Sequence, residues 1–250
     1  GDLRDLHSFP TRRSSDLGKD PAAILSIPHP ANNASAEGLA QELTMHLMQM
    51  NEGKATETLR RAFALYPVDH VLIEIVQPTL IEIGESWHRG EIPIAIEHYA
   101  TQFCMQHLMS MLHAAAPPAH GGLLVAACAP GEQHQIGILI LVVMLRWRGW
   151  NVKYLGPDLQ LERLEEALAP LRPRLLLFSA TRPETAQNLT QISTLLKNFP
   201  PPAPLVVLGG QAFQTLELPD HVPAIYLNAP PTEMIVTIEN LMKSPESSPL

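Results

Sequence analysis

The stretch Leu123-Leu-Val-Ala-Ala-Cys-Ala-Pro-Gly-Glu-Gln-His-Gln-Ile-Gly137 decides the fold. Its first five residues form a short, continuous apolar run, which is typical of a strand buried on both faces. A loop containing Pro130-Gly131 follows, and the apolar run over 136–147 predicts a helix. A buried strand that leads through a loop into a helix is the first unit of an open, parallel α/β sheet.

The same alternation of strand and helix continues downstream. Further strands are predicted over 152–155, 175–179, 205–208 and 224–227, and helices over 161–168, 183–196 and 232–242. This order predicts an α/β fold with a doubly wound, flavodoxin- or Rossmann-like, five-stranded parallel sheet, which we assign to residues 119–243. Sheets of this kind bind ligands outside the carboxyl ends of their strands, where the strand order reverses.

A helical segment precedes the sheet. Leu39, Leu43 and Leu47 recur at helical spacing, and further helices are predicted over 56–66, 68–87 and 93–113. Pro78 lies inside the third helix and is expected to kink or divide it. Four to five helices joined by short turns predict an antiparallel helical bundle over residues 36–116.

The two ends of the chain lack such patterns. Residues 7–17 look like a translated cloning or sequencing-adapter sequence, so we expect residues 1–35 to be disordered and partly a sequence artefact. We also expect a disordered tail over 244–250.

Composition narrows the class of protein. The 250 residues are 46% hydrophobic and 17% charged, which suffices for one large or two modest domains with cores. A net charge of −8 argues against direct DNA binding by this chain. Two cysteines cannot form a disulfide framework, and no apolar run approaches about 18 residues, so we expect a cytoplasmic protein that does not span a membrane.

The loop after the first strand carries the best candidate for a metal ligand. Glu132 stands two residues before His134 and can hydrogen-bond one ring nitrogen, leaving the other free to bind a metal. Gly137 would let a bulky group approach the start of the following helix. The alternative is a solvated loop histidine without a ligand, since short motifs are weak evidence alone.

Two other strand ends lie at the same edge of the predicted sheet: Ser179-Ala-Thr181 and Gly209-Gly210. The three motifs, in this order, resemble the cobalamin-binding Rossmann-like domains. The resemblance implies that His134 is the lower axial cobalt ligand, and that Ser179, Thr181, Gly209 and Gly210 line the slot for the displaced nucleotide tail. Glu132 stands where most members have Asp. The resemblance also assigns four neighbours of His134 to the cofactor site: Gln133, Gln135, Ile136 and Gly137.

The helical segment carries a second signature, Trp87 followed after nine residues by Glu97-His98. Read alone, it is a core tryptophan at a helix end and a polar patch. Beside the cobalamin motifs it resembles the CarH-type cobalamin photoreceptors, in which a four-helix bundle caps adenosylcobalamin. The stretches 87–91, 130–137 and 154–158 are also similar. The resemblance implies that Trp87, Ile94, Glu97 and His98 bind the upper face of the cofactor, and that His88 can ligate cobalt from above after illumination.

The expected function is a cobalamin-binding light sensor and not an enzyme. Photolysis of adenosylcobalamin would change the cap, and with it homo-oligomerisation or binding to a partner transcription regulator, as in the similar AerR-type antirepressors. Residues 1–35 are too few for a helix-turn-helix domain, so the chain is either a stand-alone sensor or the sensor half of a longer protein. The alternative is a corrinoid methyl carrier, which needs an open upper face; Trp87 and Glu97 argue against it.

The remaining notable side chains are assigned to packing. We expect Cys104 and Cys128 to be small buried residues and Trp147 and Trp150 to anchor the first helix of the sheet domain or an intersubunit face. We place three histidines on helix surfaces, without a ligand set among them: His46, His107 and His113.

Overall fold

The computed structural model describes residues 35–216, 218–219 and 221–244. The expected disorder and artefact at the N-terminus, apart from Ser35, and the expected tail after Ser244 lie outside these residues. None of the helices in the described ranges combines the length and the apolar character needed to cross a bilayer.

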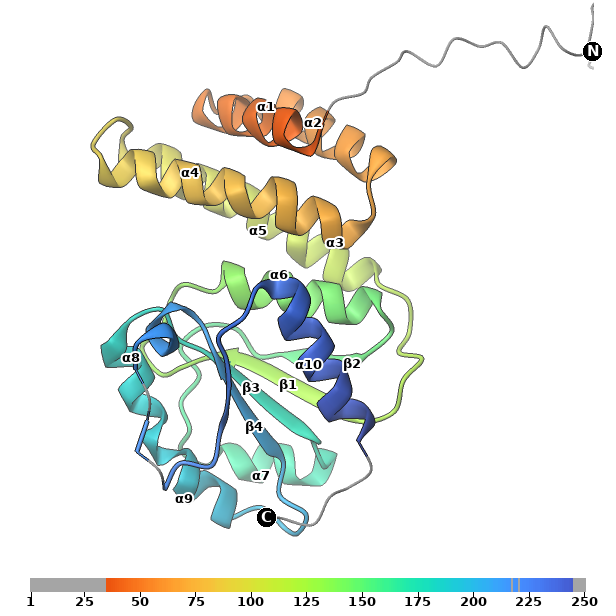
Figure 1. The fold of residues 1–250 in the computed structure, drawn as a ribbon, viewed down its shortest axis with the longest axis vertical. Coiled ribbons are helices and arrows are strands. Elements are labelled where there is room, and N and C mark those ends of the chain that lie inside the picture. The colour runs from red at the N-terminus through yellow and green to blue at the C-terminus, as the bar shows by residue number, and fades with distance from the viewer. Residues whose placement is uncertain (1–34, 217, 220, 245–250) are drawn as a thin grey trace, which may run out of the picture. The chain divides into compact units, whose positions relative to one another are not determined.

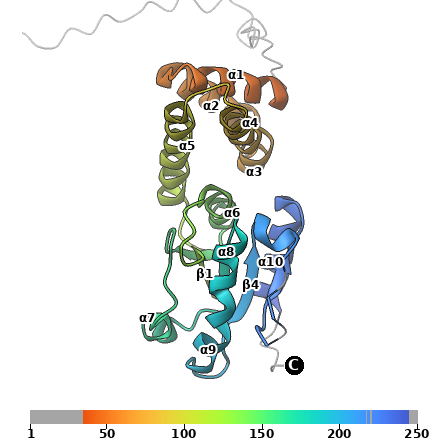
Figure 2. The ribbon, with the colours of Figure 1, turned by 90° about the vertical axis from the view of Figure 1, so that its left-hand side faces the viewer.

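The first half of the described chain is helical (Figures 1 and 2). Its elements are α1 (Ala36–Met48), α2 (Glu52–Leu65), α3 (Val68–Val71), a π-helical turn (Leu72–Val76), α4 (Gln77–His88) and α5 (Ile94–Ala114). Side chains cap the first two helices: Ser35 Oγ accepts from the Gly38 N–H at 3.0 Å, and Asn51 Oδ1 accepts from the Lys54 N–H at 3.2 Å. The Asn51 cap explains why α2 begins four residues earlier than predicted.

The predicted third helix is divided, and the division precedes Pro78. Proline has no N–H to donate and its ring crowds the carbonyl four residues earlier, here that of Glu74. Glu74 lies within the π-helical turn, whose wider backbone accommodates the proline without ending the helix.

The second half is a parallel sheet of β1 (Leu123–Cys128), β2 (Asn151–Tyr154), β3 (Leu175–Ser179), β4 (Leu205–Gly209) and β5 (Ile225–Leu227). The strand order β2-β1-β3-β4-β5 is flavodoxin-like, which confirms the predicted fold class. Every residue of β1 is buried, as expected for a strand covered on both faces. The order reverses between β1 and β3, so the loops that follow these two strands flank the switch point.

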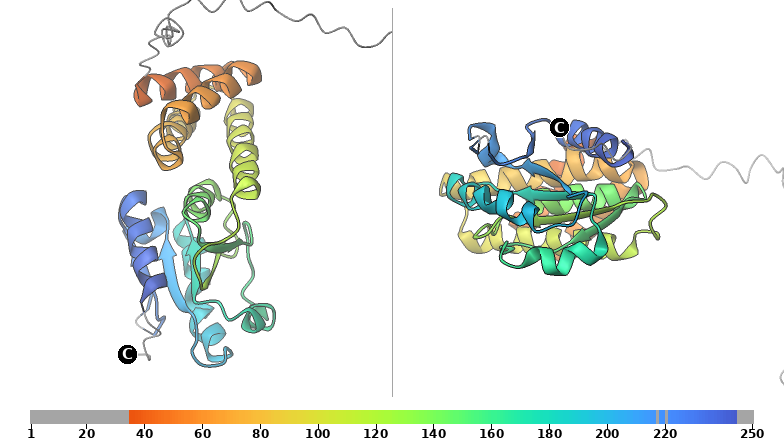
Figure 3. Two further views of the ribbon diagram at one scale, coloured as in Figure 1. Left: turned by 90° about the vertical axis from the view of Figure 1, so that its right-hand side faces the viewer. Right: turned by 90° about the horizontal axis from the view of Figure 1, so that it is seen from below.

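Helices cover both faces of the sheet. They are α6 (Ile136–Trp147), α7 (Leu164–Leu168), α8 (Pro183–Gln187), α9 (Ile192–Lys197) and α10 (Pro231–Lys243), with short 3-10 turns at Ala169–Leu171, Asn188–Gln191 and Gln211–Gln214. Figure 3 shows α7 and α10 on opposite sides of the sheet. Leu123, Val125 and Ala127 alternate along β1 and join the apolar core under α7, α8 and α9.

Two helices of the sheet domain differ from prediction. The predicted helix 183–196 is interrupted by the 3-10 turn Asn188–Gln191, and the Asn188 amide donates to the Pro130 carbonyl at 2.9 Å. The predicted helix 161–168 begins only at Leu164, because Arg163 has a positive φ of 56°.

The bundle and the sheet domain contact each other through α6. Trp147 Nε1 donates to the Met111 carbonyl at 3.1 Å, and Arg148 binds Asp69 Oδ2 through Nε at 2.9 Å and Nη2 at 2.6 Å. Arg148 also lies 3.4 Å from Glu239 Oε1 on α10, which accepts from Trp150 Nε1 at 3.1 Å. Both tryptophans therefore anchor α6 within this chain.

One expectation about the bundle is wrong. His46 is buried, with 6% of its surface exposed, and does not lie on a helix surface. It sits on the face of α1 that packs in the bundle, with Nε2 3.7 Å from Glu42 Oε1. Cys104 and Cys128 are buried as expected, and burial raises the pKa of each thiol to about 12.

Candidate functional site

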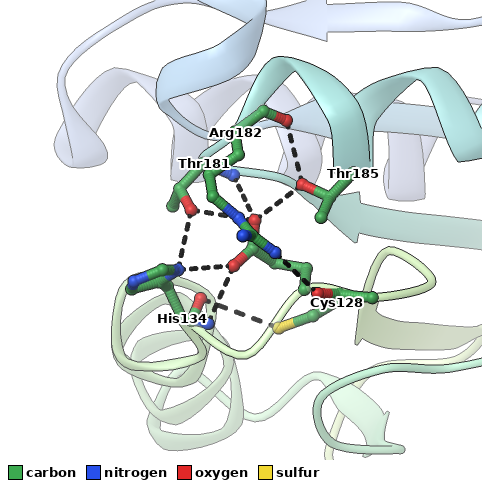
Figure 4. Close-up of polar contacts among 7 residues, drawn as sticks. Cys128, His134, Thr181, Arg182 and Thr185 are labelled. Carbon is green, nitrogen blue, oxygen red and sulfur yellow. Dashed lines mark hydrogen bonds and ion pairs between the residues drawn. The ribbon is translucent and has the colours of Figure 1, made fainter.

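A buried carboxylate organises the carboxyl edge of the sheet (Figure 4). Glu132 has no exposed surface. Its Oε1 accepts from the His134 N–H at 2.9 Å and lies 2.6 Å from His134 Nδ1. Its Oε2 accepts at 2.8 Å from the N–H of Thr181, from the hydroxyl of Thr181 and from the hydroxyl of Thr185. One side chain thus joins the loop after β1 to the segment after β3.

These donors keep the carboxylate ionised. Burial alone would raise the pKa of Glu132. The hydrogen bonds from the N–H groups of His134 and Thr181 and from the hydroxyl of Thr185 outweigh this effect and hold the pKa well below its usual range. A carboxylate only accepts hydrogen bonds. The proton of a neutral His134 imidazole is therefore held on Nδ1, and the lone pair is left on Nε2.

The imidazole itself is accessible. The His134 side chain is 66% exposed, whereas its partner Glu132 is fully buried. The ring is also 3.0 Å from Thr181 Oγ1 through Nδ1, so both neighbours engage the same nitrogen. This arrangement, in which a carboxylate orients one ring nitrogen and leaves the other free, is the one that metal-binding histidines use.

The loop that carries His134 is held by hydrogen bonds that the sequence did not predict. Gly131, whose φ is +79°, donates its N–H to Asp158 Oδ1 at 2.6 Å. The Asp158 N–H donates to the Glu132 carbonyl at 2.9 Å, and Arg182 Nη2 donates to the Gly131 carbonyl at 3.0 Å. Thr185 was also missed; the only available signal was its place in the first turn of the helix after the third strand.

Gln135 and Gly137 continue the loop into α6. The Gln135 amide oxygen accepts from the Tyr154 hydroxyl at 2.9 Å, and burial raises the pKa of that phenol. A Cβ placed on Gly137 would meet no other heavy atom within 4 Å, so open space lies beside the start of α6. Gln133 is exposed and Ile136 half-exposed beside His134.

The other predicted strand ends lie side by side. Ser179 pairs with Gly209 across β3 and β4, and Cys128 pairs with Ser179 across β1 and β3. Gly210 has φ +105°, and a Cβ there would overlap the carbonyl oxygen of Ala180. The second glycine of the pair is therefore required by the backbone packing of this chain, whatever else lies nearby.

The cap residues form two local pairs. At the end of α4, the half-buried Trp87 ring lies 4.6 Å from the exposed His88 ring, tilted by 41°. In the first turn of α5, Glu97 Oε2 lies 2.7 Å from His98 Nδ1, and Glu97 Oε1 accepts from Thr101 Oγ1 at 2.9 Å.

Within the described ranges, no hydrogen bond, ion pair or ring contact joins either cap pair to the other or to His134. Ile94, at the start of α5, is 49% exposed. Arg89 fixes the turn after His88 through Glu82 at 3.1 Å, Glu85 at 3.5 Å and Glu91 at 2.9 Å.

Both halves of the chain match known protein families. A family described as the B12 binding domain matches residues 122–221, and a second family with the same description matches residues 39–112. The solved structure of the Methanosarcina barkeri monomethylamine corrinoid protein superposes with a TM-score of 0.64, covering 82% of this chain and 98% of that one. At 18% identity, this likeness concerns the fold alone.

The chain is also similar in sequence to three described proteins. The chain is 30% identical to the HTH-type transcriptional repressor CarH of Myxococcus xanthus over 71% of its own length and 59% of that protein. It is 26% identical to the repressor CarA of the same organism, over 88% of this chain and 74% of CarA. It is 23% identical to dimethylamine corrinoid protein 3 of Methanosarcina acetivorans, over 66% of this chain and 78% of that one.

The chain thus spans about three fifths of the length of CarH. B12 binding domains match its helical bundle and the first four strands of its sheet, and CarH and CarA align over most of the chain. The chain therefore carries B12 binding domains and resembles the CarH-type cobalamin-binding proteins.

Proposed function

We propose that this chain is a light sensor that binds adenosylcobalamin between its helical bundle and the carboxyl edge of its sheet. Light would alter the bundle, and the altered surface would change self-association or binding to a transcription regulator in the cytoplasm. The observation that carries the proposal is the pair Glu132 and His134, which presents one accessible imidazole nitrogen at the switch point of the sheet.

The donor set of the site fits a corrinoid. No group of three or more His, Cys, Asp or Glu side chains gathers to hold a metal ion within the part of the chain that the structure describes. A corrin ring brings four nitrogen ligands of its own, so a single histidine is what the protein has to supply. In this proposal His134 is the lower cobalt ligand and Glu132 orients it.

The other residues at this edge would hold the rest of the cofactor. Gln133, Gln135, Ile136 and Gly137 flank His134 in the loop and at the start of α6, and open space lies beside Gly137. Ser179 and Thr181 lie at the end of β3, and Gly209 and Gly210 at the end of β4, both on the other side of the switch point from β1. We assign the nucleotide tail to this second group.

The bundle would close the upper face. We assign Trp87, Ile94, Glu97 and His98 to it, since the exposed Ile94 and the half-buried Trp87 offer apolar surface beside a polar pair. When bound, adenosylcobalamin supplies a light-sensitive cobalt–carbon bond. Loss of the adenosyl group would free the Trp87 ring. His88 lies against that ring and follows it in sequence, so its imidazole would replace the adenosyl group as the upper ligand.

The names of two relatives support a role in transcription. CarH and CarA are both described as HTH-type transcriptional repressors. The chain carries a net charge of −8, which does not favour direct DNA binding, so we propose that it acts through self-association or through a partner regulator. It would be a sensor and not a catalyst.

The experiment is an absorption spectrum of the adenosylcobalamin-loaded chain, kept dark and then illuminated with green light. The sensor should show a stable new spectrum after illumination and a changed sedimentation or partner affinity. A chain that keeps its dark spectrum, or that is photolysed without any change in association, would contradict the proposal.

A corrinoid methyl carrier is the second candidate, favoured by the 23% identity to a dimethylamine corrinoid protein over 78% of that chain. Such a carrier must present its upper face to a partner enzyme. Tight binding of methylcobalamin, with no preference for adenosylcobalamin and no response to light, would favour this reading.

A further inference from the structure

The bundle holds a groove that lies between α1 and residues 74–82 of the π-helical turn and α4. It encloses about 780 Å³. Its apolar and small lining residues are Ala36, Ala40, Thr44, Met45, Met48 and Pro78. None of these residues belongs to the proposed cofactor site.

Small side chains create the groove. Thr79 Oγ1 donates to the Ala40 carbonyl at 3.1 Å, which draws α1 and α4 together at that point. On either side of this contact, Ala36 and Thr44 are too short to fill the space between the helices. Met45 remains 46% exposed there, and exposed methionines adapt well to varied apolar partners.

The rim of the groove is acidic. Glu37, Glu74 and Glu82 line it, all three are exposed, and the described lining contains no Lys or Arg. Glu82 is paired with Arg89, whereas Glu37 receives only the Gln41 amide at 3.4 Å. Glu74 has no hydrogen bond or ion pair among the described residues. Two carboxylates therefore flank the apolar floor without neutralising partners.

The shape of the groove suits a helix. It follows α1 from Ala36 to Gln49, a length of roughly 20 Å at 1.5 Å per residue, which matches three to four turns of a second helix. A helix in an apolar groove contacts it with residues spaced i, i+3, i+4 and i+7. Its flanks here would meet Glu37 and Glu74.

We propose that this groove binds a basic amphipathic helix of a partner protein. Residues 35–116 carry ten acidic and four basic side chains, so a second copy of the bundle would be repelled. A helix with lysines or arginines beside an apolar stripe would instead be attracted. The inference does not rest on the bound cofactor or on light.

The test uses two synthetic 14-residue helical peptides and the full-length chain. Both peptides carry leucines at i, i+3, i+4 and i+7; one has lysines on its flanks and the other has glutamates. The lysine peptide should bind with a dissociation constant below roughly 100 μM, and at least about tenfold more tightly than the glutamate peptide. Its affinity should fall as salt is raised.

Matched variants locate the binding. The double change Glu37→Lys with Glu74→Lys should weaken the lysine peptide roughly tenfold, since it reverses both unpaired rim charges. Glu162→Lys with Glu184→Lys makes the same change in net charge at two exposed positions of the sheet domain and should leave the affinity unchanged. Met45→Gln alters the floor alone and should weaken both peptides.

Three results would overturn the proposal. The first is equal binding of the two peptides, and the second is equal affinity of the lysine peptide for the groove and control variants. The third is a dimer of the unliganded chain that Glu74→Lys dissociates, because the groove would then be a contact between copies of this chain. Circular dichroism of each variant separates loss of binding from loss of fold.

Discussion

The fully buried carboxylate of Glu132 lies 2.6 Å from Nδ1 of the exposed His134 imidazole, and this contact joins the interior of the sheet domain to its surface. The same carboxylate accepts the N–H and hydroxyl of Thr181 after β3. The direction of the imidazole is therefore set by both strands that flank the switch point. A ligand that binds Nε2 would meet a ring already oriented for it.

Replacing His134 tests the lower ligand. His134→Ala should weaken cobalamin binding by at least about tenfold and remove the spectral signature of a histidine-ligated cobalt. Even residues that only hydrogen-bond a metal ligand contribute about tenfold to metal affinity. Titration followed by absorption measures both. His113→Ala, on the exposed end of α5, is the control and should behave as wild type. An unchanged affinity and spectrum in His134→Ala would remove the assignment.

Glu132→Gln tests the orienting carboxylate. An amide has one acceptor oxygen where the carboxylate has two, so at least one of the donors from Thr181, Thr185 and His134 loses its partner in a buried site. The variant should lose about 1–3 kcal/mol of unfolding free energy and bind cobalamin roughly tenfold more weakly. Urea unfolding of the apoprotein and cobalamin titration measure the two effects. Full stability with full affinity would show that the carboxylate orients nothing.

Two glycines should respond in opposite ways to alanine. In Gly210→Ala the new methyl group meets the Ala180 backbone at a φ of +105°, so the apoprotein should lose several kcal/mol, roughly 3 or more. In Gly137→Ala the methyl group points into open space inside a helix, and the apoprotein should be unchanged or more stable by about 0.5–1 kcal/mol.

The second variant separates fold from binding. If the cofactor uses the space beside Gly137, Gly137→Ala should bind cobalamin more weakly despite its stable fold. Unchanged cobalamin affinity in Gly137→Ala would mean that nothing bulky approaches the start of α6.

Trp87 tests the choice between sensor and methyl carrier. If its ring packs on the adenosyl group, Trp87→Ala should abolish the preference for adenosylcobalamin over methylcobalamin, a loss of roughly tenfold or more in relative affinity. Trp87→Phe keeps an aromatic ring and should retain part of the preference. Competition titrations with the two cofactors measure the ratio. A wild type that never prefers adenosylcobalamin would favour the methyl carrier.

The sheet domain could be predicted well because its signals are local. The apolar run of α6 is bounded by the Gln135 loop and by Gly149, so the predicted helix 136–147 coincides with the observed Ile136–Trp147. The pairing of Glu132 with His134 also follows from a two-residue spacing. The strand order places Ser179 beside Gly209, as parallel strand ends require.

Features that depend on contacts between distant segments could not be predicted. The break before α9 involves Asn188 and the carbonyl of Pro130, 58 residues away in sequence. His46 was expected on a helix surface, but it is buried on the inward face of α1, near Glu42. Thr185 reaches Glu132 only because β1 and β3 are neighbours, and no short motif marks it.

Hydrogen exchange of residues 77–98, compared between the dark and the green-illuminated adenosylcobalamin complex, shows whether light acts through the helical bundle. This segment contains α4, its turn and the start of α5, with Trp87, His88 and Glu97. We expect illumination to change the exchange of this segment while β1 and β3 keep theirs. His88→Ala should alter the illuminated pattern but not the dark one. Complete photolysis with identical exchange over 77–98 in the dark and in the light would contradict this expectation.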